Sequence, residues 1–191
     1  MRSVVLAVIG LVLTLGMADA TNPDPDLCSA APADQIGGII LYPDPLQIPE
    51  GTARLVVNVR NGMDQPIPDA FVELIIGVPG NHCLCDLPQD TGTTDADGNV
   101  VLFPSGGGCT DNVPNAVIIR ANAFSIRSYP NLKSPDYSGG PPNCDVGLPD
   151  FTVFGNAYTT SAPGCTDYDN NGSTTLADFS VFGSAWDHFC P

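Results

Sequence analysis

Two short segments in the C-terminal third of the chain repeat one another, and this repeat limits what the region can fold into. Residues 148–158, LPDFTVFGNAY, align with residues 176–186, LADFSVFGSAW, at an offset of 28, and seven of the eleven positions are identical. In each copy a Leu, two Phe residues and a final aromatic residue are spaced three, three and four apart, on one face of a helix. Neither helix could bury that face alone, so we predict two helices that pack on each other. The predicted core residues are Phe151, Phe154, Phe179 and Phe182.

An acidic loop precedes the second predicted helix. Its sequence, DYDNNG, is followed by an Asp eleven positions after its first residue, which gives the pattern D-x-D-x-N-G-x5-D. This spacing is typical of a calcium-binding loop, where a Gly allows a sharp turn and the ligands are hard oxygen atoms. An ordinary solvated turn rich in Asp, Asn and Gly is the alternative. The predicted Ca²⁺ ligands are the side chains of Asp167, Asp169, Asn171 and Asp178 and the backbone carbonyl of Ser173.

A weaker version of the same loop precedes the first predicted helix. Asp136-Tyr137 corresponds to Asp167-Tyr168, but at an offset of 31, so this loop is three residues longer than the second. Small residues stand at its middle positions, where oxygen-bearing side chains are expected. A second Ca²⁺ site and a metal-free structural loop are both open. The candidate ligands are Asp136, Ser138, Asp145 and Asp150, with Asn143 as an alternative to Asp145.

The two loop-helix units resemble the type I dockerin, a module that docks onto cohesin domains. The second loop is similar to that of an EF-hand, with Asp in place of the usual Glu at position 12, and the first loop is a degenerate copy. Pro163 and Gly164 argue against a helix entering the second loop. The resemblance covers about residues 131–191. It implies two helices ordered by Ca²⁺ and a cohesin-like secreted or surface protein as partner. The outward helix positions expected to meet that partner are Thr152, Asn156, Ser180 and Ser184.

The N-terminal residues have the pattern of a secretory signal. Arg2 is followed by an apolar run over residues 4–15 and by the small-x-small site Ala18-Asp19-Ala20, so residues 1–20 are predicted to be a signal peptide. The apolar run is too short to span a bilayer well, and we expect a secreted chain with no membrane insertion after cleavage. A formal net charge of −15 makes nucleic acid an unsuitable partner.

All seven cysteines follow the predicted signal, and an oxidising compartment favours disulfide bonds. Cys165 and Cys190 bracket the second loop-helix unit, so we predict that they are bonded to each other. A metal cluster built on the segment HCLC, residues 82–85, is the less favoured alternative, because C-x-C is not a usual zinc spacing. The cysteines left without an assigned partner are Cys28, Cys83, Cys85, Cys109 and Cys144.

The N-terminal two thirds of the chain has the pattern of a β-sandwich. Residues 21–34 are predicted to form an extended leader, residues 35–130 a sandwich of short strands separated by Gly- and Pro-rich turns, and residues 130–133 a linker. The segments VRNGMDQPIPDAFV and GTTDADGNV resemble bacterial Ig-like domains of the invasin/intimin kind. The predicted fold is therefore mainly β with a small α C-terminal module. In it, an Ig-like β-sandwich precedes two loop-helix calcium-binding repeats over residues 131–191.

The sequence contains two histidines, each apart from any nucleophile motif, and no phosphate-binding or metallohydrolase pattern. We therefore expect a secreted, non-catalytic calcium-binding protein whose dockerin-like module attaches the Ig-like domain to an extracellular assembly or cell surface. One alternative is a carbohydrate-binding or enzymatic accessory protein that acts through the sandwich. Another is a purely structural calcium module.

Overall fold

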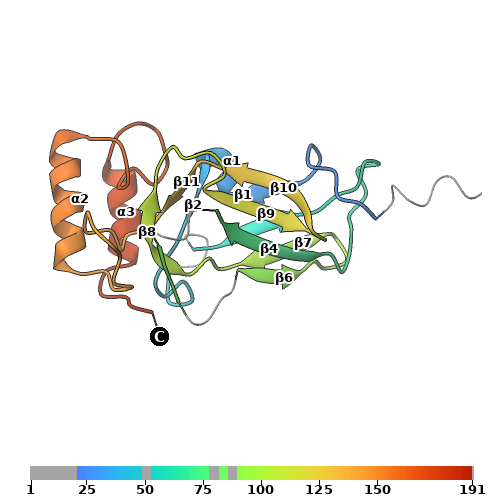
Figure 1. The fold of residues 1–191 in the computed structure, drawn as a ribbon, viewed down its shortest axis with the longest axis horizontal. Coiled ribbons are helices and arrows are strands. Elements are labelled where there is room, and N and C mark those ends of the chain that lie inside the picture. The colour runs from blue at the N-terminus through green and yellow to red at the C-terminus, as the bar shows by residue number, and fades with distance from the viewer. Residues whose placement is uncertain (1–20, 49–52, 78–81, 86–89, 191) are drawn as a thin grey trace, which may run out of the picture.

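The computed structural model describes residues 21–48, 53–77, 82–85 and 90–190 (Figure 1). The predicted signal peptide lies outside these residues. Most of the regular secondary structure in these residues is β-strand, which confirms the mainly β prediction. Its elements are β1 (Ser29–Ala31), α1 (Ala33–Ile36), β2 (Gly38–Ile40), β3 (Leu55–Asn58), β4 (Phe71–Ile76), β5 (His82–Leu84), β6 (Thr91–Thr93), β7 (Asn99–Leu102), β8 (Gly106–Thr110), β9 (Val117–Ala121), β10 (Phe124–Tyr129), β11 (Asn131–Lys133), α2 (Leu148–Thr160) and α3 (Leu176–Ser184).

Two of the three sheets form a β-sandwich. One has the strand order β1-β3-β7 and the other β10-β9-β4-β6, with antiparallel neighbours throughout. Alternate apolar residues point inward from both sheets, as Leu55 and Val57 do on β3 and Val72 and Leu74 on β4. Burial of these side chains from water is the main force that holds the two sheets face to face.

The third sheet connects the sandwich to the C-terminal part of the chain. Its order is β2-β11-β8-β5, with β11 parallel to β2 and antiparallel to β8. The linker predicted over residues 130–133 is therefore wrong, because residues 131–133 are the buried strand β11 inside this sheet. Leu132 is fully buried in the sandwich core, and its two polar neighbours find tertiary hydrogen-bond partners. Such partners are not visible in local composition.

The predicted extended leader is also wrong for the second half of its range. Ala30 on β1 pairs with Val57 on β3, and α1 begins at Ala33. The polar residue Asp34 accepts hydrogen bonds from the backbone N–H of Ala30 (2.7 Å) and from the hydroxyl of Tyr129 (2.6 Å). A segment rich in Pro, Asp and Ala is thus tied down by contacts with strands far along the chain.

Helices α2 and α3 lie side by side at one end of the molecule, next to the third sheet (Figure 1). They begin at Leu148 and Leu176, the first residues of the two repeat copies. A second core joins them to the β part, since it combines Tyr42, Ile48 and Ala53 with Phe154 and Phe182. The two helices are therefore packed against the β part of the molecule through this second core.

Half of the predicted aromatic core is exposed. Phe154 and Phe182 have exposed fractions of 1% and 2%, whereas Phe151 and Phe179 have 44% and 42%. The prediction that all four are core residues is therefore wrong for the second pair. The physical reason is that the β part covers only one side of the two-helix layer.

The disulfide bonds differ from the one predicted. Cys165 is bonded to Cys109, and Cys190 to Cys85, so the predicted Cys165–Cys190 pair is wrong. The third bond joins Cys83 to Cys144, and Cys28 is a buried free thiol. Each bond has one cysteine in or next to β5 or in β8, and the other among the C-terminal 50 residues. The cysteines pair across the contact between β5 or β8 and the C-terminal part of the chain. Closeness in sequence does not predict this contact.

Within the described residues, no helix has the length and apolar character needed to cross a membrane.

Candidate metal centre

Three carboxylates of the second loop converge. One oxygen atom from each of Asp167, Asp169 and Asp178 lies within 4.8 Å of the others. Asp167 and Asp178 are buried, and Asp169 is half-buried. Like charges at this separation repel one another strongly when they are partly shielded from water, so a bound cation or a proton would stabilise the cluster.

Backbone N–H groups donate to all three of these carboxylates, and that of Asp169 accepts from Asn171 (3.1 Å). The carboxylate of Asp167 accepts from Asn171 (3.1 Å) and from Gly172 (2.9 Å). Gly172 has φ of 94°, a left-handed conformation that suits glycine and lets the loop turn back on itself. The carboxylate of Asp178 accepts from the backbone N–H of Tyr168 (2.6 Å) and of Thr175 (2.7 Å). Asp178 therefore caps helix α3 and closes the loop at the same time.

The two remaining predicted ligands are less clearly placed. Asn171 is exposed, and its side-chain oxygen accepts from the backbone N–H of Ser173 (3.0 Å). Its side-chain nitrogen donates to Asp169 (2.9 Å). Both polar atoms of the Asn171 side chain are thus hydrogen-bonded within the loop. Ser173 is half-buried at the bend that follows.

The donor set of this loop fits Ca²⁺. Burial raises the pKa of Asp167, and the neighbouring Asp169 and Asp178 add to this shift. The backbone N–H of Gly172 and the charge of Lys133 oppose it. The convergent atoms are carboxylate oxygens, which are the hard ligands that Ca²⁺ and Mg²⁺ take, and no thiol or imidazole takes part.

The first loop is built differently. Asp136 is buried, and its carboxylate accepts from the backbone N–H of Cys144 (2.8 Å) and of Asn143 (3.4 Å). Asp150 is also buried; one of its oxygens accepts from Gly147 (2.9 Å), and the other has no hydrogen-bond partner. Burial raises the pKa of Asp136 to about 6, and the nearby carboxylates of Asp150 and Asp145 add to this effect against the N–H groups that lower it.

The other predicted members of the first site stand apart. Asp145 is exposed and Ser138 half-buried. Among the described residues, the carboxylates of this loop do not form a cluster as tight as that of the second loop. The unpartnered oxygen of Asp150 remains the one atom here that a cation would satisfy.

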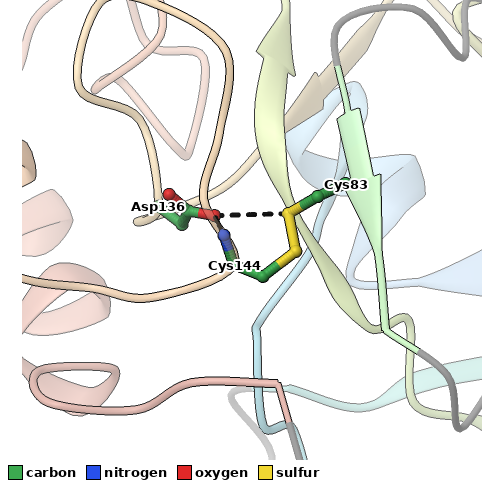
Figure 2. A group of neighbouring side chains, drawn as sticks. All are labelled: Cys83, Asp136 and Cys144. Carbon is green, nitrogen blue, oxygen red and sulfur yellow. Dashed lines mark hydrogen bonds between the residues drawn. A yellow bond between two sulfur atoms is a disulfide. The ribbon is translucent and has the colours of Figure 1, made fainter.

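Figure 2 shows the carboxylate of Asp136 directed at the Cys83–Cys144 bond. The Asp136 oxygen lies 3.4 Å from the Cys83 sulfur, which is a close contact, because a disulfide sulfur has no hydrogen to donate. Cys83 and Cys144 cannot bind a metal as thiolates while their sulfurs are bonded to each other, so this group is not a metal site. Gly107 on β8 provides the space, since a Cβ there would lie 1.8 Å from the Asp136 oxygen. The triple glycine of β8 is thus the sequence signal of this close approach, and it lies outside the acidic loops.

The zinc alternative on residues 82–85 is excluded by the same bonds. Cys83 and Cys85 are both in disulfides, and His82 makes contacts with the hydroxyl of Thr110 (2.8 Å) and the carbonyl of Gly107 (3.2 Å). His82 is therefore part of the β5–β8 pairing.

An open apolar groove of about 400 Å³ lies on the exposed side of the two helices. Trp186 is one of its lining residues, with its ring 5.9 Å from that of Phe151 in an edge-on arrangement. The first residues of the two repeat copies are both exposed apolar side chains, Leu148 (70% exposed) and Leu176 (67%). The groove is lined by Leu148, Phe151, Phe179, Phe182, Gly183 and Trp186.

The polar positions predicted to meet a partner are exposed, apart from Ser184, which is half-buried. Their hydroxyls are already used within the helices. Thr152 donates to the carbonyl of Leu148 (2.9 Å), and Ser180 to that of Leu176 (3.1 Å). Asn156 lies on the same helix as Thr152 and is exposed. A partner would therefore meet apolar side chains beside small polar groups.

No protein-family model matches this chain, and no curated protein matches it. Similar solved structures include two of a type II cohesin–X–dockerin complex from Acetivibrio cellulolyticus. The N-terminal interface mutant is 18% identical, with 68% of this chain and 88% of that chain covered and a TM-score of 0.27. The C-terminal interface mutant is 17% identical, with 80% and 95% covered and a TM-score of 0.30. At these identities and TM-scores, neither likeness carries an argument about fold or function.

Proposed function

We propose that this chain is a secreted, non-catalytic calcium-binding protein whose C-terminal loop-helix pair attaches a β-sandwich to an extracellular partner. The observation that carries the proposal is the convergence of Asp167, Asp169 and Asp178 within 4.8 Å in a loop with calcium-binding spacing. A Ca²⁺ ion there would offset the repulsion among three carboxylates. In the first loop, Asp136 and Asp150 would be the residues available to a second ion.

The apolar groove supports the docking part of the proposal. Side chains of Phe151, Phe179 and Trp186 are 42–44% exposed on one face, which is the kind of surface that protein partners cover. The motif resemblance to dockerins makes a cohesin-like protein the partner class we propose. Because Asp178 caps α3 and also belongs to the metal cluster, loss of Ca²⁺ would loosen the helix that forms one wall of the groove.

The calcium proposal is tested by titrating the full mature chain with CaCl₂ in a calorimeter. Asp169→Asn keeps the shape of the side chain and removes one charge from the cluster, so we expect affinity to fall at least about tenfold. Asp187→Asn is the matched control, because Asp187 is exposed and outside the loop, and its affinity should equal that of the unaltered chain. An unaltered chain that takes up no calcium at millimolar concentrations would refute the proposal.

The docking proposal is tested by capture from the secreted proteins of the source cells, with and without a chelator. We expect capture only with calcium, and we expect Phe151→Ser with Phe179→Ser to abolish it while calcium affinity is kept. Thr152→Arg with Ser180→Arg tests the adjacent polar positions. If both double variants capture as well as the unaltered chain, the helical pair is not the docking site.

Carbohydrate binding through the sandwich is a second candidate, supported by two exposed aromatic side chains. Phe71 at the start of β4 is 48% exposed, and Phe124 at the start of β10 is 47% exposed. Both lie beside the β9–β10 turn, where the side chain of Asn122 accepts from the backbone N–H of Phe71 (3.0 Å). Co-sedimentation with insoluble polysaccharides, compared with that of Phe71→Ala and Phe124→Ala, tests this candidate. No retention of the unaltered chain would exclude it for the polysaccharides used.

A further inference from the structure

Lys133 is the only lysine in the chain, and it is buried with an exposed fraction of 2%. Its ammonium forms three contacts: with a carboxylate oxygen of Asp111 (2.9 Å), with the backbone carbonyl of Asp167 (2.8 Å) and with the side-chain oxygen of Asn170 (2.6 Å). An ammonium has three N–H donors, and each one has an acceptor here. A buried charge is tolerated only with such complete pairing, so the position of this side chain is closely determined.

Two of the three contacts are made to the second loop. The Asp167 carbonyl belongs to the first loop position and Asn170 to the fourth, and neither atom is a predicted calcium ligand. Lys133 therefore contacts the loop through a backbone carbonyl and an amide oxygen, and not through the three converging carboxylates. Residues 134–190 contain no Lys or Arg, so a cation at this place must come from the β part of the chain.

Asn170 continues the connection toward the sandwich. It has a left-handed conformation, with φ of 56°, and its side-chain nitrogen donates to the carbonyl of Ile36 (2.8 Å). Gly38 leaves space for this contact, since a Cβ there would come within 3.2 Å of the Asn170 nitrogen and closer still to Asn131. Asn170 thus links the loop to Lys133 and to the last residue of α1.

A covalent bond holds the start of the same loop. Cys109 on β8 is the register partner of Lys133 on β11, and it is bonded to Cys165, two residues before Asp167. The first residues of the loop are therefore fixed to two adjacent strands of the third sheet. Both fixing points come from residues more than 30 positions earlier in the sequence.

We propose that Lys133 is a positioning residue for the calcium loop, which holds the loop in the shape that brings Asp167, Asp169 and Asp178 together. The inference rests on the proposed calcium function and deepens it, because it links calcium binding to the β-sandwich. An opposing effect exists, since a cation near the site repels Ca²⁺. Positioning outweighs repulsion here because the ammonium contacts a carbonyl and an amide oxygen, and it leaves the three carboxylates to the ion.

The test compares Lys133→Met with the unaltered full mature chain by calcium calorimetry. Residues that orient metal ligands typically change affinity about 10- to 100-fold when they are removed, and we expect a fall in that range. Leu132→Ala is the matched control: Leu132 is the adjacent residue of β11, is fully buried in the sandwich core, and belongs to a different hydrophobic cluster from the loop. It should lower the melting temperature and leave calcium affinity unchanged. A structural defect alone would not separate the two variants in this way.

A second variant serves if Lys133→Met fails to fold. Asn170→Gly suits the left-handed backbone and removes both side-chain contacts, so affinity should fall in the same direction. Hydrogen exchange in chelator should also become faster at the N–H groups of Asn171 and Gly172 in both variants, and not in Leu132→Ala.

The outcomes separate the two proposals. Calcium binding by the unaltered chain together with equal or tighter binding by Lys133→Met or Asn170→Gly overturns the inference about Lys133 and leaves the calcium proposal standing. No calcium binding by the unaltered chain overturns both.

Discussion

Phe154 and Phe182, which occupy equivalent positions in the two repeat copies, stack on each other with ring centroids 4.9 Å apart and an interplanar angle of 24°. Both rings are buried, and Tyr168 also stacks on Phe154, with ring centroids 6.3 Å apart. The repeat therefore forms a near-symmetric aromatic contact between its two helices. The same contact places the metal loop next to the helix core, because Tyr168 follows directly after the loop residue Asp167.

The first prediction separates the buried ring from the exposed ring of one helix. Phe182→Ala should lower the free energy of unfolding by about 3–5 kcal/mol, because it removes a buried aromatic side chain and leaves a cavity. Phe179→Ala should cost much less, since its ring is 42% exposed. Urea denaturation of the two variants measures the difference. Equal losses would contradict the division of the four Phe residues into a buried pair and an exposed pair.

The second prediction compares equivalent carboxylates of the two loops. Asp150 and Asp178 are the third residues of α2 and α3, both are buried, and each accepts a hydrogen bond from the backbone at the start of its helix. Asp178→Asn should weaken calcium binding at least about tenfold. Asp150→Asn should have a smaller effect, because the carboxylates of its loop do not converge as tightly. Two equivalent losses in calorimetry would show that the loops bind calcium alike.

The third prediction concerns the disulfide bonds. Mass spectrometry of the non-reduced chain should find peptides that join Cys109 to Cys165, Cys85 to Cys190 and Cys83 to Cys144. Cys109→Ser with Cys165→Ser should lower the free energy of unfolding by about 2–4 kcal/mol, since the bond closes a loop of 56 residues in the unfolded chain. Cys28→Ala, which changes a free thiol, should leave the peptide pattern unchanged. A Cys165–Cys190 peptide would contradict the observed pairing.

The fourth prediction is a pH dependence of stability in calcium-free solution. The pKa of Asp136 is raised from 3.8 to about 6, so the folded chain binds the proton more tightly than the unfolded chain does. Stability from this group is present at low pH and is lost as pH rises from about 3.8 to about 6, by at most about 1.4 kcal/mol per pH unit. The pKa values of Asp150 and Asp167 are also raised, and these groups act in the same direction.

Asp136→Asn should make the decline in stability with pH less steep, and urea denaturation at several pH values in the presence of a chelator measures it. Asp97→Asn, which changes an exposed carboxylate in the turn before β7, is the control and should keep the slope of the unaltered chain. A slope that is the same in all three proteins would show that burial of Asp136 has no energetic effect.

Local sequence patterns determined where several helices, strands and turns of this protein form. The spacing of Leu148, Phe151 and Phe154 predicts a helix from Leu148, and α2 begins at that residue. The alternation of Leu55 and Val57 predicts a strand with one buried face, which β3 has. The D-x-D-x-N-G spacing brings Asp167 near Asp169, because both lie within one turn of the chain. Periodicity and turn chemistry act over a few residues, so they can be read from the sequence directly.

Tertiary structure alone decided the features that depend on distant partners. Phe154 and Phe182 are the buried pair of the four Phe residues because they pack with Tyr42 and its neighbours, more than 100 residues earlier in the chain. The partners of Cys165 and Cys190 depend on which strand edges face the helices. Lys133 belongs to a segment whose composition predicts a linker, and it becomes a buried cation because Asp111, Asp167 and Asn170 meet there. Burial and pairing depend on which elements pack against each other, so they cannot be predicted from the order of residues within one element.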